Sequence, residues 1–183
     1  MYIEDIETNW NNGLGLFPVS NFVKLYGDDE NADIVKLYEA VPDEPKDIIF
    51  YSEPNTNLSL FPFLTSTLMV NQYHVSLIID ESFSSILSIP RHRTILYCSA
   101  DFVKYNLEKA VSILTENDII IMNIKTIREL RIIRNNLLKH EVNSRIMFDA
   151  STFNKDEVLK ESEVYDVIPY TGNTEIFKQN SLT

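Results

Sequence analysis

Six short apolar segments most constrain how this chain can fold. They lie at residues 47–53, 74–80, 94–100, 118–124, 145–151 and 165–170. Four of them, including DIIIMNI at 118–124, are nearly continuous apolar runs rather than alternations of apolar and polar residues. Strands that are covered on both faces have this pattern, and parallel sheets are covered in this way. The segments therefore predict a parallel sheet.

The stretches between these segments have the apolar spacing of helices. Within 101–117 one helical face collects Val103, Leu107, Ala110, Val111 and Leu114. Within 126–141 the face is Ile127, Leu130, Ile133 and Leu137, and Thr126 and Glu129 have the spacing of a capping box. Shorter helices are predicted at 58–72 and after Asn154. Because parallel neighbours need long crossovers, we expect a Rossmann-like three-layer α/β fold with a parallel, doubly wound sheet.

The N-terminal part differs from this pattern and is predicted to be a small acidic helical subregion, residues 1–46, before a core at 47–183. Val-Lys-Leu-Tyr occurs twice in it, at 23–26 and 35–38. One continuous helix would place the two copies on different faces, because twelve residues at about 100° each leave an offset of about 120°. We therefore expect two helices, the first ended by Gly27 and the second capped within 28–33.

The charge is spread unevenly along the chain, whose net charge is -11. Residues 1–53 hold 12 acidic and 3 basic side chains (net -9), whereas residues 91–145 hold 10 basic and 6 acidic ones (net +4). These regions could complement each other or face different partners. The candidate partner-binding residues are basic in one region and acidic in the other: Arg128 and Arg131, and Asp28, Asp29 and Glu30. The overall acidity argues against nucleic-acid binding.

Several chemistries are not expected. None of the four glycines stands in a strand-to-helix turn, so neither a GxxxxGK[ST] nor a GxGxxG phosphate loop can be placed. Cys98 is the only cysteine, which excludes an intrachain disulfide and thiolate zinc sites. His74 begins one predicted strand, and His92 precedes the strand that ends near Cys98. Both histidines are therefore expected at the opposite edge of the sheet from Cys98, and a catalytic triad is not expected. No apolar run is long enough to span a membrane, and we expect a cytoplasmic protein.

Polar side chains follow the predicted strands, where ligands bind to open parallel sheets. The candidate catalytic residues are Asp80, Glu81, Asp149 and Lys125. Carboxylates that converge there could hold Mg²⁺ and orient a phosphoryl group, with the lysine as charge partner. The same polar positions could instead cap the helices that follow them, and no metal site is assigned.

Two functional hypotheses follow from these observations. The first is a non-catalytic, partner-binding protein built on a Rossmann-like core, with another protein as its partner. The alternative is a Mg²⁺-dependent phosphate-ligand binder, phosphotransferase or hydrolase that uses the carboxylates at the strand ends. The sequence alone leaves open the partner, the substrate, the oligomeric state and the strand order.

Overall fold

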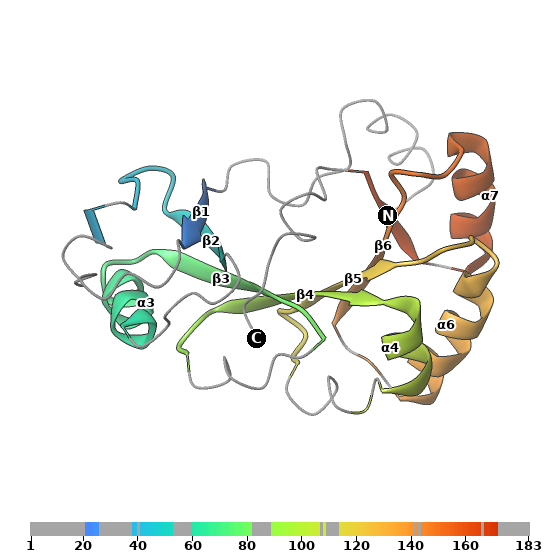
Figure 1. Cartoon of the computed structure of the whole chain (residues 1–183), viewed down its shortest axis with the longest axis horizontal. Helices are drawn as coiled ribbons and strands as arrows, with labels where there is room; N and C mark the ends of the chain where they lie inside the picture. The colour runs from blue at the N-terminus through green and yellow to red at the C-terminus, as the bar shows by residue number, and fades with distance from the viewer. Residues whose placement is uncertain are drawn as a thin grey trace. The chain divides into compact units, whose positions relative to one another are not determined.

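A computed structural model describes residues 21–25, 38–39, 41–52, 60–81, 89–106, 108, 114–140, 142, 144–165 and 167–171. The strands are β1 (Asn21–Leu25), β2 (Asp47–Ser52), β3 (His74–Ile79), β4 (Arg93–Ser99), β5 (Ile119–Asn123), β6 (Arg145–Asp149) and β7 (Ile168–Tyr170). The helices are α3 (Phe61–Val70), α4 (Ala100–Tyr105), α6 (Glu129–Lys139) and α7 (Lys155–Tyr165). Figure 1 labels these elements.

The α/β, Rossmann-like fold class with a parallel sheet is confirmed. Within the described residues seven strands form the sheet, and they follow one another in chain order from β1 to β7. The expected doubly wound order is wrong, because such a sheet reverses its strand order once and this order does not reverse. All six segments that the sequence predicted as strands are strands of this sheet.

The chain divides into two compact units, with the division inside β4. One unit comprises Phe17–Ile95 and Glu175–Thr183, and the other comprises Met1–Leu16 and Leu96–Thr174. We call them the β1–β3 unit and the β5–β7 unit and describe each by itself. The predicted N-terminal subregion, 1–46, lies mostly outside the described residues, and its boundary stays a prediction.

The helix predicted for the first Val-Lys-Leu-Tyr copy is wrong. Residues 21–25 form a strand, not a helix, and Asn21 to Leu25 pair in parallel with Ile48 to Ser52 of β2. Backbone pairing with a buried neighbour therefore overrides the helical reading of so short a segment. The second copy ends at Tyr38, and Tyr38 and the following Glu39 are in helical conformation.

Helix α3 covers part of the β1–β3 unit, and the sequence predicted it. The helix packs on β3, and Leu64 and Leu68 on its inner side are fully buried. The Phe61 ring meets the Phe50 ring of β2 edge to face, with 4.9 Å between the ring centroids. This aromatic contact fixes the start of the helix against the sheet.

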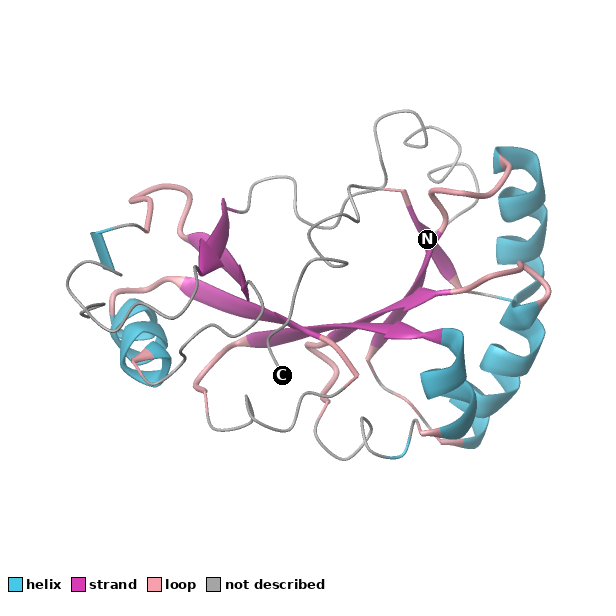
Figure 2. Ribbon diagram, in the orientation of Figure 1, coloured by secondary structure: helices cyan, strands magenta, loops and turns pink. Residues whose placement is uncertain are grey.

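Three helices of the β5–β7 unit, α4, α6 and α7, lie side by side. Helix α4 contacts α6, α6 contacts α7, and the ribbon in Figure 2 shows them as neighbours. Ile119 to Met122 of β5 are at most 4% exposed. Because successive strand residues point to opposite faces, β5 is covered on both sides, as the continuous apolar run predicted.

The helix predicted over 101–117 is not one continuous helix in the structure: it is interrupted at Asn106, Glu108 is again helical, and Leu114 is not. Helix α4 ends at Tyr105, and Asn106 leaves the helical region with φ -131°. Val103 is buried as expected, whereas 107 and 109–113 lie outside the described residues. The predicted stripe is confirmed at Val103 only.

The N-termini of α6 and α7 carry the polar caps that the sequence predicted. Glu129 Oε2 accepts hydrogen bonds from the backbone N–H groups of Thr126 and Lys125, which is one half of a capping box. Asn154 Oδ1 accepts from Asp156 N at 2.9 Å and so caps α7. The predicted stripe is buried at Ile127, just before α6, and at Leu130 and Ile133 within it, with Leu137 half-buried.

Candidate functional site

Asp149 lies at the carboxyl end of β6 and is the most enclosed of the predicted catalytic candidates. The residue is 6% exposed. Its Oδ1 accepts from Ser151 Oγ at 2.6 Å and from Ser151 N at 3.0 Å, and its Oδ2 accepts from Tyr97 Oη at 3.4 Å. The carboxylate therefore organises the turn between β6 and α7 and ties it to β4.

The pKa of Tyr170 in β7 is affected by the same carboxylate. Burial, together with the negative charge of Asp149, raises the pKa of Tyr170 to about 12. The phenol is therefore neutral over the physiological range and can donate a hydrogen bond but cannot act as a base. Ala150 N donates to Tyr170 O at 2.9 Å, so the backbone holds β7 beside this turn.

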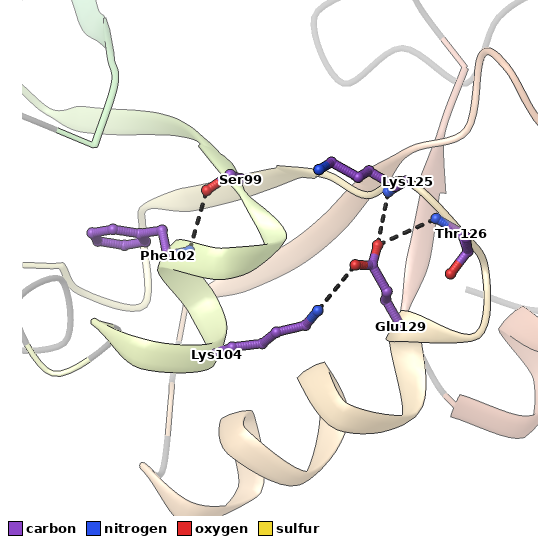
Figure 3. Close-up of polar contacts among 6 residues, drawn as sticks. All are labelled: Ser99, Phe102, Lys104, Lys125, Thr126 and Glu129. Carbon is purple, nitrogen blue, oxygen red and sulfur yellow. Dashed lines mark hydrogen bonds and ion pairs between the residues drawn. The ribbon is translucent and has the colours of Figure 1, made fainter.

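Lys125 follows β5 in the same unit, and its side chain is exposed. Its backbone N–H donates to Glu129 Oε2 at 2.7 Å, while Lys104 Nζ of α4 forms an ion pair with Glu129 Oε1 at 3.0 Å (Figure 3). Burial opposes ionisation of Glu129, but the hydrogen bonds from Lys104, Lys125 and Thr126 outweigh it and hold the pKa of this carboxyl below its usual range. Glu129 thus joins α4, α6 and the turn after β5.

Asp80 and Glu81 follow β3 and lie in the β1–β3 unit, whereas Asp149 and Lys125 lie in the other unit. Asp80 is partly exposed and Glu81 is exposed. In the part of the chain that the structure describes, no group of three or more His, Cys, Asp or Glu side chains could hold a metal ion. A magnesium site built from Asp80, Glu81 and Asp149 stays a prediction.

The basic residues Arg128 and Arg131 lie on the outward face of α6, and both are exposed. At about 100° per residue, an arc of about 120° on this helix also contains Ile132, Asn135, Leu138 and Lys139. We call these six residues the α6 exposed face: Arg128, Arg131, Ile132, Asn135, Leu138 and Lys139. All six are exposed, and the apolar pair Ile132 and Leu138 is 51% and 65% exposed.

The acidic candidates Asp28, Asp29 and Glu30 lie outside the described residues. Cys98 is buried at 2% exposed near the carboxyl end of β4. His74 is the first residue of β3, and His92 directly precedes β4. The histidines therefore start the strands, as predicted, while Cys98 lies near the end of its own.

The sequence did not reveal a polar cluster at the amino ends of β2, β3 and β4. The rings of His74 and His92 stack with 5.0 Å between their centroids, and His92 Nδ1 accepts from Val75 N at 3.1 Å. Asp47 Oδ1 lies 3.8 Å from His74 Nδ1 and 3.9 Å from an Arg93 guanidinium nitrogen.

Burial, with the nearby positive charge of Arg93, lowers the pKa of His74 despite the opposing influence of Asp47. The signal in the sequence was the place of His74 and His92 at two strand starts. Using it required knowing that these strands are neighbours.

No helix within the described residues combines the length and apolar character needed to cross a membrane.

Comparisons of the chain with protein-family models, curated proteins and solved structures give no significant match.

Proposed function

We propose that this chain is a non-catalytic protein-binding module that docks an acidic segment of another protein on the α6 exposed face. The observation that carries the proposal is the exposure of Ile132 and Leu138 among Arg128, Arg131 and Lys139 on one helix face. Apolar side chains that are ringed by charges of one sign favour a partner with apolar contacts and the opposite charge.

The magnitudes favour binding through this apolar pair. Burial of what is exposed of Ile132 and Leu138 would contribute roughly 1–2 kcal/mol per side chain. Each ion pair at the rim would add at most about 1 kcal/mol. The basic residues would instead accelerate the encounter with an acidic partner and set its orientation.

The helix that presents this face is held firmly, which lowers the entropic cost of binding. Leu130 and Ile133 on its inner side are fully buried. Asn136 Nδ2 donates to the carbonyl oxygens of Val103 and Lys104, so the middle of α6 is fixed to the end of α4. The Lys104–Glu129 ion pair fixes its start.

We propose a protein rather than a nucleic acid as partner, because the net charge of -11 opposes binding to phosphate backbones. We also propose a cytoplasmic setting. The single cysteine, Cys98, is buried, which suits a reducing compartment where proteins do not depend on disulfides.

Photo-crosslinking in the organism of origin tests this proposal. A photoreactive amino acid at Asn135, in the middle of the face, should give one dominant crosslinked protein. The same group at Lys160, an exposed position on α7, should not. The crosslink should weaken in the double variant Arg128→Glu/Arg131→Glu and persist unchanged in the control Glu157→Lys, which changes an exposed charge on α7.

The purified partner should then bind more weakly as salt rises, as a charge-steered complex does. Equal crosslinking from positions 135 and 160, or an unchanged crosslink in the double variant, would refute docking on the α6 exposed face.

A further inference from the structure

Helix α3 exposes a face of a different kind, which the proposed function does not use. Phe63 is 63% exposed and Val70 is 82% exposed, and Ser66 and Thr67 between them are also exposed. The sequence has no charged residue from Pro54 to Tyr73. Among the described helices, α3 is therefore the one without any charge.

The four exposed residues are arranged symmetrically along the helix. At about 100° per residue they fall within an arc of about 100°. The order is large, small, small, large, with its midpoint between Ser66 and Thr67. Thr67 Oγ1 donates to Phe63 O at 2.8 Å, so this hydroxyl keeps a partner when water leaves the face. The polar cost of desolvating Thr67 is therefore low.

We propose that this face binds a second copy of the chain, with the two α3 helices antiparallel across a two-fold axis. Such an axis between Ser66 and Thr67 places Phe63 of each copy against Val70 of the other, and the small residues let the helices approach closely. Each copy carries a net charge of -11. Repulsion between the acidic copies opposes association through the charged parts of the surface, whereas the uncharged α3 face adds no repulsion of its own.

The contact is small, because each copy contributes one face of a ten-residue helix. Stable complexes bury about 1,200 Å² or more. We therefore expect a reversible dimer with a dissociation constant on the order of 100 µM. Its association should strengthen as salt screens the repulsion between the copies, whereas binding of an acidic partner to α6 should weaken.

Sedimentation equilibrium with a charge-swap series tests this geometry. Phe63→Lys and Val70→Glu should each weaken association at least tenfold. The double variant should recover most of it, because every introduced lysine then faces a glutamate of the other copy. A parallel arrangement would pair position 63 with position 63, so it would show no such recovery. Leu138→Lys on α6 should leave the dimer unchanged. These positions are exposed, and circular dichroism checks that the variants fold.

Disulfide crosslinking provides a second readout. The native Cys98 is buried, so Ser66→Cys introduces an exposed thiol close to the proposed axis. Mild oxidation should give a covalent dimer in this variant but not in Lys160→Cys on α7. A chain that stays monomeric up to about 1 mM, ten times the expected dissociation constant, would overturn the proposal. Equal crosslinking at both positions, or binding of the monomer to phosphatidylcholine vesicles without any dimer, would also overturn it.

Discussion

The imidazole of His92 supplies an acceptor to a backbone N–H at the start of β3. Its Nδ1 accepts from Val75 N at 3.1 Å, while the His92 backbone N–H donates to Val75 O at 2.9 Å. Val75 is fully buried in the native chain, but His92 is exposed, so water can reach the freed N–H in His92→Ala and replaces part of the lost bond. We expect the free energy of unfolding to fall by about 0.5–1.5 kcal/mol, the net value of such a hydrogen bond. For a chain of this size the melting temperature should fall by roughly 1–6 °C.

Two further substitutions separate the hydrogen bond from the ring. His92→Asn keeps an acceptor near the position of Nδ1 but loses the stacking on His74, whose ring centroid lies 5.0 Å away. His92→Phe keeps an aromatic ring but has no acceptor. If the hydrogen bond dominates, the asparagine variant should be more stable than the phenylalanine variant.

Urea denaturation gives the free energies, and hydrogen exchange of the Val75 amide gives a local readout. His140→Ala is the matched control. The hydrogen bond of His140 that closes α6 runs from its backbone N–H to Asn136 O, so alanine keeps it. This control should change stability by less than about 0.5 kcal/mol. A stability cost of His92→Ala no larger than that of the control, or equal exchange rates of the Val75 amide in both variants, would refute the stabilising role of this hydrogen bond.

Four other predictions follow from contacts described above. Burial lowers the pKa of His74 in the folded chain, whereas in the unfolded chain this histidine becomes protonated below about pH 6.5. Stability to urea should therefore fall as the pH drops from about 6.5 to the lower pKa of the folded chain. Glu129→Ala should cost about 1 kcal/mol and Glu129→Gln less, because the amide oxygen can still accept at the start of α6; thermal melts will distinguish them. Asp149→Asn should lower the pKa of Tyr170 from about 12, as measured by ultraviolet titration of the phenol. If the magnesium alternative holds, Mg²⁺ with a phosphate analogue should raise the melting temperature of the native chain but not of Asp80→Ala; no shift in the native chain would remove that alternative.

The strands were the most predictable part of the fold. The run Ile119–Met122 is buried on both faces, and such a strand has no polar face that could make its pattern ambiguous. Strand β1 was missed because Val-Lys-Leu-Tyr is too short to favour one conformation. Its pairing with β2 comes from a segment that begins more than twenty residues later along the chain.

The polar contacts were predictable where they are local in the chain. The cap formed by Asn154 and the acceptor role of Glu129 both involve residues within four positions. The contact of Asp149 with Tyr97 spans 52 positions. It depends on which strands are neighbours, and the sequence pattern does not contain that information. The histidine cluster was missed for the same physical reason.

The order of the strands also bears on how the chain acquires its fold. Asn21 pairs with Ile48, Asp47 with His74, Ile119 with Arg145 and Met147 with Ile168, so these partners are separated by 21 to 27 residues. In a doubly wound sheet, by contrast, the two central strands come from distant parts of the chain, and they must find each other before the centre of the sheet can form. Pairing between chain neighbours keeps the loop-closure entropy low for a parallel sheet and favours fast folding. During synthesis each strand leaves the ribosome when its partner is already outside, so β2 can pair with β1, and β3 with β2, while the rest of the protein is still being made.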